Sequence, residues 1–369
     1  MKLGFFSPLP PAPTGVADYS AALLPALKRM GAPPADINLY HLGNNQLHRD
    51  IYERALREPG VVVLHDALLQ HFFLGSLTEQ EYVEEFKYNY GAWSESHARS
   101  LWRARARSGS DAAYFRYPML KRIAEVSRAI IVHNPGAAEV VRAHAPNAVI
   151  YEIPHLFIPP DAPPAYEVER LRARLRLSGS TFLLAVFGHL RESKRITTVL
   201  RAFERVRQDC DIQLLLAGDF ASRDLERSLT IGSGILRVPY LPDADFWLYA
   251  SAVDACINLR YPSAGETSGI AIRLMGMGKA IVLTEGLEIS RFPRGSCIPI
   301  PPGLAEEEML ADCMYWLATH PYDAQEIGRR AEQHIGTEHS IDQVAKLYWR
   351  TLETACYHDR KPVGLTDRS

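Results

Sequence analysis

Long apolar runs, a strong net charge and internal repeats are all absent from the 369-residue sequence. No run approaches the roughly 18 apolar residues needed to cross a bilayer, and the proline-rich N-terminus lacks the apolar core of a signal peptide. The formal net charge of -2 gives no global attraction to nucleic acid or to an anionic membrane. We therefore expect a cytoplasmic protein without a nucleic-acid partner, at most peripheral at the inner face of the membrane.

Paired cysteines are also absent. The five cysteines form no CxxC pair and show no metal-ligand spacing, which favours free thiols in a reducing compartment. We expect no metal and no organic cofactor. The composition, 47% apolar and 23% charged, is typical of a globular protein rather than a disordered one.

Short aliphatic runs alternate with longer helical patterns along the chain. Several runs are almost continuously apolar, as in parallel strands that helices cover on both faces. The chain is longer than one hydrophobic core usually organises, and the proline-rich segment 156–169 separates two series of runs. We predict an α/β protein of two doubly wound Rossmann-like domains that face each other across a cleft. The expected strands are residues 2–7, 37–42, 60–66, 129–134, 149–154, 182–188, 212–219, 234–239, 255–260 and 279–285.

In such sheets ligands bind beyond the carboxyl ends of the strands. Gly15 follows the first strand and begins a helical pattern, where a glycine lets backbone amides approach a phosphate; an ordinary turn is the alternative. His65 ends the third strand, where it could donate a hydrogen bond or act as an acid or base; a helix cap or a core hydrogen bond is the alternative. His71, on the apolar face of the next helix, is expected in the core.

The stretch GHLRESK follows the strand at 182–188 and contains Gly188, His189, Arg191 and Lys194. Cations grouped just beyond a strand and a glycine suit a diphosphate, because they neutralise the charge that grows on a departing phosphate. A solvated basic loop is the alternative interpretation.

The stretch YPSAGETSG, residues 261–269, precedes an apolar helix. The amides of Thr267, Ser268 and Gly269 at this helix N-terminus favour an anion such as phosphate. The carboxylate of Glu266 would repel phosphate but accepts hydrogen bonds from sugar hydroxyls. The loop therefore predicts a sugar-phosphate ligand, and an N-terminal capping box is the alternative.

In their order along the chain, these motifs resemble those of the retaining nucleotide-sugar glycosyltransferases of family 4 (group 1), which have the GT-B fold. The resemblance runs from FFSPLPPAPTGVADYS through VVVLHD, FGHLRESK, LLLAGD and RYPSAGETSGIAIRLMGMGKAIVLTE to HSIDQVAKLYWRTLE. It implies an acceptor-side domain at 1–160, a nucleotide-sugar domain at 161–345 and a C-terminal helix at 346–369 that crosses back to the first domain. The implied function is retaining, metal-independent sugar transfer in polysaccharide, lipopolysaccharide or glycolipid synthesis.

The resemblance also implies roles for individual residues. His65 would face the donor sugar, and Glu266 would hold the hydroxyls of that sugar. Lys194 would bind the diphosphate, with His189 at the place of the usual arginine and Arg191 as a substitute for it. The remaining donor-side positions are Gly15 and Gly188 near phosphate, Tyr240 and Leu241 near the nucleotide base, and the amides of Thr267, Ser268 and Gly269.

Arg273 departs from the family pattern. The motif usually has a second glutamate that binds the ribose, and Arg273 stands at that place with a spacing one residue short. An arginine cannot accept hydrogen bonds from ribose hydroxyls as a carboxylate does. The ribose contact and the preference for a base therefore stay open.

A DxD-like pair, Asp243 and Asp245, precedes an amphipathic helical pattern. Although DxD motifs hold a divalent cation in other glycosyltransferases, the position before a helix favours capping. The run Trp93–Arg107 combines two tryptophans with four arginines. It could rest on an anionic lipid surface, and a solvated face with a buried stripe is the alternative.

Two other classes of protein are considered. A nicotinamide-dependent oxidoreductase would share the fold class, but no GxGxxG follows the first strand. A catalytically inactive nucleotide-sugar-binding protein would have the same motifs, and the residues at 189 and 273 keep this alternative open.

Overall fold

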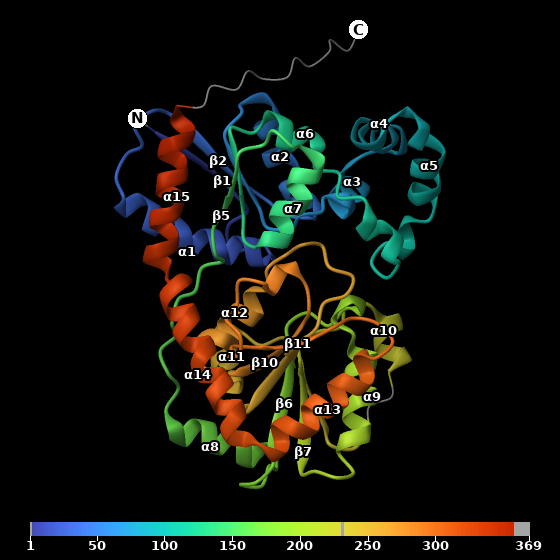
Figure 1. Ribbon diagram of the computed structural model, residues 1–369, viewed down its shortest axis with the longest axis vertical. Helices are drawn as coiled ribbons and strands as arrows, with labels where there is room; N and C mark the ends of the chain where they lie inside the picture. The colour runs from blue at the N-terminus through green and yellow to red at the C-terminus, as the bar shows by residue number, and fades with distance from the viewer. Residues whose placement is uncertain (1, 230–231, 358–369) are drawn as a thin grey trace. The chain divides into compact units, whose positions relative to one another are not determined.

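The computed structural model describes residues 2–229 and 232–357 (Figure 1). The chain forms two compact units: unit 1 comprises Met1–Leu156, Pro262–Thr267 and His339–Ser369, and unit 2 comprises Phe157–Tyr261 and Ser268–Glu338. The sequence suggested divisions after residues 160 and 345, and residues 358–369 of the expected C-terminal helix lie outside the described part. The segment Pro262–Thr267, which carries Glu266, groups with unit 1 although the residues on both sides of it belong to unit 2.

Unit 1 is built on a parallel five-stranded sheet in the order β1-β2-β3-β4-β5. The strands are β1(Leu3–Phe6), β2(Ile37–Leu42), β3(Val61–Leu64), β4(Ala129–Val132) and β5(Ile150–Glu152). Every residue of β3 and β4 is buried, because helices cover both faces of the sheet.

The helices of unit 1 divide between these two faces. Helices α1(Gly15–Arg29) and α15(Ile341–Cys356) share one core with the sheet, and the hydroxyls of Tyr19 and Tyr348 lie 2.9 Å apart between them. The opposite core contains α2(Arg49–Arg57), α6(Lys121–Val126) and α7(Pro135–His144). Between β3 and β4 the chain forms α3(Gln70–Ser76), α4(Glu79–Tyr90) and α5(Glu95–Arg103), and α4 and α5 lie to one side of the sheet (Figure 1).

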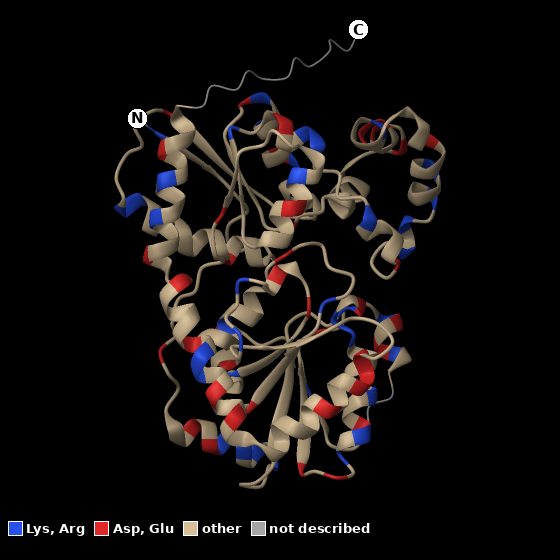
Figure 2. Ribbon diagram, in the orientation of Figure 1, with Lys and Arg blue, Asp and Glu red and all other residues tan. Residues whose placement is uncertain are grey.

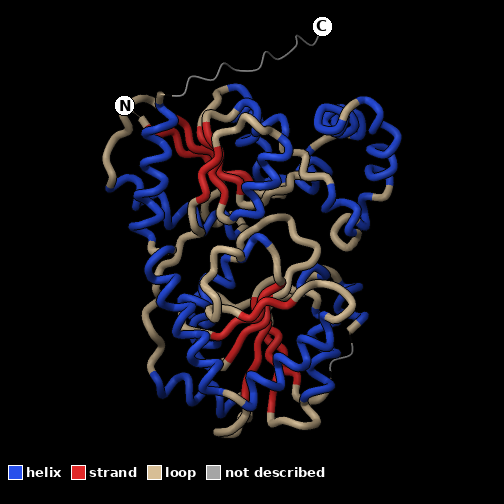
Figure 3. The backbone as a smooth tube through the Cα atoms, viewed as in Figure 1, coloured by secondary structure: helices blue, strands red, loops and turns tan. Residues whose placement is uncertain are grey.

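Unit 2 contains a parallel six-stranded sheet in the order β11-β10-β9-β6-β7-β8. Figure 3 shows the strands of this sheet in red between blue helices. The chain thus proceeds from β6 outward in one direction, returns to β9 beside β6, and continues in the other direction. This reversal is the switch point of a doubly wound sheet, where ligands bind beyond the carboxyl ends of the two central strands. The strands are β6(Phe182–Phe187), β7(Ile212–Ala217), β8(Ile235–Val238), β9(Ala255–Asn258), β10(Ala280–Thr284) and β11(Ile298–Ile300).

Helices also cover both faces of the second sheet. Helices α9(Ile196–Val206) and α13(Glu306–Thr319) pack on one face. Helices α11(Asp243–Ala252), α12(Gly269–Gly276) and α14(Pro321–Glu338) contribute to the core on the other. Helices α8(Ala165–Arg174) and α10(Arg223–Ser228) complete the unit, and α8 begins inside the proline-rich segment interpreted as a linker. The α/β fold class with helices on both faces of parallel sheets is confirmed, as are all ten predicted strands.

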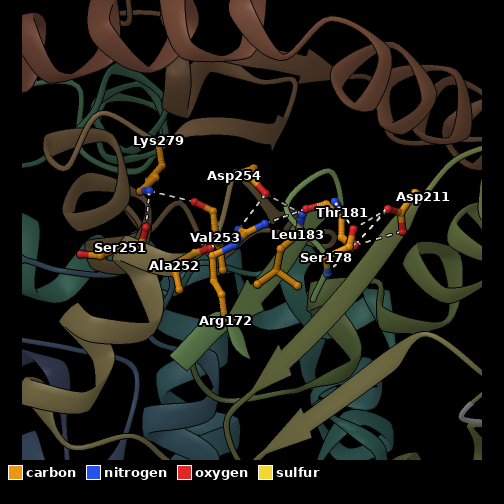
Figure 4. A network of polar contacts seen from close by, with 10 residues as sticks. All are labelled: Arg172, Ser178, Thr181, Leu183, Asp211, Ser251, Ala252, Val253, Asp254 and Lys279. Atoms are coloured by element: carbon orange, nitrogen blue, oxygen red, sulfur yellow. Dashed lines mark hydrogen bonds and ion pairs between the residues drawn. The ribbon is translucent and has the colours of Figure 1, made fainter. Parts of the chain in front are cut away.

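A polar network ties together the amino ends of the strands of unit 2 (Figure 4). The Arg172 guanidinium on α8 donates to the carbonyls of Ala252 and Thr181, both at 2.7 Å. The Asp254 carboxylate accepts from the Leu183 amide at 2.7 Å and from Arg172 at 3.2 Å. Because these contacts lie at the edge opposite the carboxyl ends, they stabilise the sheet and leave the ligand-binding edge to other residues.

Candidate functional site

The residues singled out from the sequence fall into two groups, one in each unit. Unit 1 contains Gly15, His65, Glu266 and Thr267. Unit 2 contains Gly188, His189, Arg191, Lys194, Tyr240, Leu241, Ser268, Gly269 and Arg273. Each group is described within its own unit.

In unit 2, Gly188 begins the loop at the carboxyl end of β6 with a φ of +84°. A Cβ atom there would lie 3.0 Å from Cδ1 of Ile270 on α12 and 3.3 Å from Nζ of Lys194. Both the backbone conformation and the close approach therefore require glycine. This glycine lets the loop after β6 pass directly against the first turn of α12.

Lys194 is the buried cation of this loop. Its side chain is only 3% exposed, and its ammonium donates to the Phe187 carbonyl at the end of β6. Burial, followed by the charges of Arg260 and Arg191, lowers the pKa of Lys194 well below its ordinary value. The Lys194 amine and two guanidinium groups thus gather at the switch point, and a bound anion would favour the protonated form of the lysine.

Arg260, which sequence reasoning did not single out, lies two residues after the end of β9. Its guanidinium donates to the Ser268 hydroxyl at 3.2 Å, and its backbone N–H donates to the Thr284 hydroxyl at 2.8 Å. Its position just beyond a buried central strand was a usable signal, because this is the ligand edge of the sheet. We call Lys194, Arg191 and Arg260 the cation cluster.

Ser268 caps α12 at this same edge. Its side chain accepts a hydrogen bond from the Ala271 amide at 3.2 Å. The first amides of a helix have no carbonyl partner within the helix, and together with the helix dipole they favour an anion. The N-terminus of α12 and the cation cluster therefore both favour a bound anion.

His189 lies beside these cations. Burial lowers its pKa first, Arg191 and Lys194 lower it further, and Asp219 acts in the opposite direction. The imidazole is therefore neutral at pH 7, and it does not replace the charge of the arginine usual in the resembling family. As a neutral ring it remains able to donate one hydrogen bond.

The two residues expected near a nucleotide base differ in exposure. Tyr240 is 70% exposed, and its backbone N–H donates to Asp219 at 3.2 Å. Leu241 packs against the core of unit 2. Only the ring of Tyr240 thus presents a broad surface to solvent.

Arg273 contacts three side chains of α11. It forms a 2.8 Å ion pair with Asp243, and its guanidinium lies 4.1 Å from the ring centroids of both Phe246 and Trp247. Asp243 and Asp245 occupy the first turn of α11, and neither makes a side-chain cap. The predicted capping by these acids is wrong, because the Asp243 carboxylate bonds to Arg273 instead.

We expect Arg273→Met to lower the free energy of unfolding by about 1 kcal/mol, because two cation–π contacts and a partly exposed ion pair are lost. Chemical denaturation measures this effect. Asp243→Asn in the Arg273→Met background should then cost little more, since its partner is already absent. A large loss of nucleotide affinity without loss of stability would instead identify Arg273 as a ligand-binding residue.

In unit 1, Gly15 is the first residue of α1, directly after the N-cap Thr14. It is exposed, and a Cβ atom would meet nothing within 4 Å. Neither packing nor an unusual backbone conformation requires a glycine at this position. The open space is compatible with the close approach of a ligand.

His65 follows β3 and lies in a cluster of buried and partly buried imidazoles. Its Nε2 atom lies 3.0 Å from Nδ1 of His41, and its ring packs edge-on against Tyr19. Burial, followed by the neighbouring histidines, lowers the pKa of His65 well below its ordinary value, so the ring is neutral at pH 7. We define the histidine cluster as His41, His48, His65, His133 and His155.

The environment of His41 favours one arrangement of protons in this pair. His41 is fully buried, and its Nε2 atom has no partner. A buried N–H without an acceptor is rarer than an under-satisfied acceptor, which favours the proton of His41 on Nδ1, where it donates to Nε2 of His65. His65 then carries its own proton on Nδ1 and presents a donor.

The loop that carries Glu266 packs closely on unit 1. The Ala67 amide donates to the Ala264 carbonyl at 2.8 Å, and Gly265 has a φ of +73° with no room for a Cβ beside Ala67. One oxygen of the Glu266 carboxylate accepts from the Ala264 amide at 2.8 Å. Ser268, rather than Glu266, caps the helix, so the carboxylate is held by its own loop two residues from the contact with Ala67.

Asn134 holds the same loop from the end of β4. Its Nδ2 group donates to the Gly265 carbonyl at 2.9 Å and to the Thr267 hydroxyl at 3.0 Å. Sequence reasoning missed Asn134, because an Asn-Pro pair before a helix predicts only a cap. The two contacts flank Glu266 on both sides.

Acidic side chains offset part of the positive charge of the run Trp93–Arg107. Arg99 pairs with Glu95 at 2.9 Å and with Glu79 at 3.6 Å. Trp102 is largely buried under Arg105, and Trp93 is 83% exposed. Figure 2 shows the acidic residues of α4 beside the basic residues of α5 and the turn after it. Among the described residues, no helix is long and apolar enough to span a membrane.

The described residues, 2–229 and 232–357, contain neither a metal-binding cluster nor a disulfide bond. No group of three or more His, Cys, Asp or Glu side chains within these ranges is arranged to hold a metal ion, the histidine cluster included. All five cysteines are free, and burial raises the pKa of the Cys256 and Cys313 thiols to about 12. The cysteines are Cys210, Cys256, Cys297, Cys313 and Cys356.

The chain is similar to several solved structures. HepE of Anabaena, in complex with UDP-glucose, matches with a TM-score of 0.63 and 13% identity over 96% of this chain and 100% of that chain. WaaG, a glycosyltransferase involved in lipopolysaccharide biosynthesis, matches with a TM-score of 0.60 and 13% identity over 95% and 99%. Sucrose-phosphate synthase from Thermosynechococcus elongatus matches with a TM-score of 0.60 and 15% identity over 91% and 78%.

These similarities establish the fold of the chain. The two parallel-sheet α/β units, taken together, have the GT-B architecture of these glycosyltransferases. No family model matches the sequence, and no curated protein matches it at a significant level. The fold class is therefore shown, whereas the reaction is inferred from the site.

Proposed function

We propose that the protein is a glycosyltransferase that moves a sugar from a nucleoside-diphosphate sugar to an acceptor hydroxyl, with retention of configuration. The observation that carries this proposal is the cation cluster of unit 2. Lys194, Arg191 and Arg260 gather at the switch point of a doubly wound sheet, beside the N-terminus of α12. A diphosphate supplies the negative charge that such a cluster and a helix N-terminus stabilise.

The donor is bound chiefly by unit 2 in this proposal. The cation cluster, with His189 and the amides of Ser268 and Gly269, binds the diphosphate, and the exposed ring of Tyr240 contacts the base. Glu266 accepts hydrogen bonds from hydroxyls of the donor sugar, and His65 donates one through Nδ1. The complex of HepE with UDP-glucose supports a uridine nucleotide as the first donor to test.

The reaction breaks the bond between the anomeric carbon and the diphosphate oxygen and forms a bond from that carbon to the acceptor oxygen. The acceptor hydroxyl loses its proton to the departing diphosphate. Lys194, Arg191 and the α12 amides stabilise the charge that develops there, which is the usual role of preorganised cations and dipoles. The acceptor binds to unit 1, and the similarity to WaaG supports a cell-envelope glycan as the acceptor class.

We expect one nucleoside diphosphate to raise the thermal unfolding temperature of the wild-type chain. A ligand at about a hundred times its dissociation constant stabilises the folded state by about 2.7 kcal/mol, which is readily measured. A screen of UDP, GDP, ADP and their sugar conjugates by thermal shift identifies the donor.

Lys194→Met serves as the matched variant, because it removes the buried amine with little change in side-chain length. It should lose most of the stabilisation by the diphosphate. If no nucleotide stabilises the wild-type chain, the cation cluster is not a diphosphate site and the proposed function fails.

A further inference from the structure

Asn134 connects two elements of unit 1 that are far apart in the sequence. This residue is 3% exposed and lies two residues after the end of β4, as the N-cap of α7. The oxygen Oδ1 accepts from the Ala137 amide at 2.8 Å. The nitrogen Nδ2 donates to the Gly265 carbonyl at 2.9 Å and to the Thr267 hydroxyl at 3.0 Å.

The partners settle the orientation of this amide. A backbone N–H must face the oxygen, and a carbonyl must face the nitrogen, so the two ends cannot be exchanged without losing both kinds of bond. Both Nδ2 hydrogens are used, one on each side of Glu266. Because the Thr267 hydroxyl accepts from Asn134, its own hydrogen remains available to donate.

The loop around Glu266 is shaped partly by bonds within the loop itself. Gly265 lies in the left-handed region, and Ser263 and Glu266 each accept from an amide of the same loop. These internal bonds shape the loop, but they do not hold it against unit 1. Bonds from the Ala67 amide and from Asn134 connect the loop to the rest of unit 1.

We propose that Asn134 is a positioning residue that holds the Glu266 carboxylate in place for the donor sugar. This inference rests on the proposed function for the role of Glu266. The clamp itself, Nδ2 on Gly265 and Thr267, is a separate physical claim. A small displacement of a group that contacts substrate costs far more in turnover than in stability.

The test uses Asn134→Ser, because serine caps helices about as well as asparagine but cannot reach Gly265 and Thr267 with two donors. We expect the amides of residues 262–267 to exchange hydrogen faster, while the amides of α7 keep their protection. We expect kcat for cleavage of the nucleotide sugar to fall about tenfold, with no change in the affinity for the free nucleoside diphosphate.

The control is Asn45→Ser, which replaces another capping asparagine of unit 1, whose Oδ1 accepts from the Leu47 amide at 3.0 Å. It should change neither the exchange of residues 262–267 nor kcat. Thr267→Val removes one of the two clamp bonds, so Asn134→Ser should have a smaller effect in that background than in the wild type. This variant keeps the test available if Asn134→Ser does not fold.

The outcomes separate the positioning role from the proposed function. Faster exchange together with a lower kcat supports the inference. Faster exchange with unchanged kcat, or unchanged exchange with any change in kcat, overturns it. If the wild-type chain cleaves no nucleotide sugar, the proposed function fails and the positioning role fails with it, while hydrogen exchange still decides whether the clamp exists.

Discussion

Glu266→Gln is expected to lower the rate of sugar transfer about 10- to 100-fold, the loss that corresponds to one or two charge-assisted hydrogen bonds. Glutamine keeps an oxygen that can accept from the Ala264 amide, so the loop retains its internal bond. It replaces one acceptor oxygen by a donor and removes the charge that binds sugar hydroxyls. Initial rates with the nucleotide sugar measure the effect.

The affinity for the free nucleoside diphosphate should not change in this variant, because in our account the cation cluster of unit 2 binds the diphosphate. Glu326→Gln is a suitable control. This acid lies on α14 and pairs with Arg329 and Arg330, at 2.7 Å and 2.8 Å. A Glu266→Gln chain that transfers sugar within twofold of the wild type would show that Glu266 does not contact the donor sugar.

Acidification is expected to destabilise the protein strongly through the histidine cluster. Burial lowers the pKa of His48 and of His133 to about 4, and burial with the charge of His133 lowers that of His155 to about 3. The unfolded chain takes up protons near pH 6.5, whereas the folded chain resists them. Stability is therefore complete above pH 6.5 and is lost as the pH falls from 6.5 through 4.

For His48 and His133 the expected loss is about 2 kcal/mol each at pH 5, from a folded pKa of about 4 and an unfolded one of 6.5. Urea denaturation at pH 7 and pH 5 measures the difference. His48→Asn should reduce that difference by about 2 kcal/mol. The free energy of unfolding of this variant at pH 7 gives the cost of losing the hydrogen bond to the His41 carbonyl. Equal stability of the wild-type chain at both pH values would contradict the burial of neutral imidazoles.

The sequence predicted the strands well, because buried parallel strands are short aliphatic runs between turns. All ten predicted strands are present, and the missed one is β11(Ile298–Ile300). This strand lies at the edge of its sheet and contains Pro299. Proline is tolerated at a sheet edge but weakens the strand pattern in the sequence.

The positions of several candidate site residues at strand ends could be predicted from local sequence. Gly188, Lys194 and the α12 N-terminus follow central strands of unit 2, and strand ends can be identified from the sequence. The clamp between Asn134 and Thr267 joins residues 133 positions apart. Nothing in either local sequence indicates the other, so this contact required the structure.

The histidine cluster was only partly predicted from the sequence. His41 is part of β2, and His65 and His133 directly follow β3 and β4. Because neighbouring parallel strands end at the same edge, a histidine at the end of each one predicts a cluster. Only His65 was predicted as a site residue, because a strand end taken by itself does not show which strands lie beside it in the sheet.

Cleavage of nucleotide sugars by the wild-type chain tests the central claim most directly. The assay follows release of the nucleoside diphosphate from UDP-glucose and other sugar nucleotides, with Glu266→Gln beside it. We predict slow release of one diphosphate even without an added acceptor, and much slower release by the variant. Binding of a nucleotide sugar without any release, with or without candidate glycan acceptors, would contradict transfer and leave a nucleotide-sugar-binding protein.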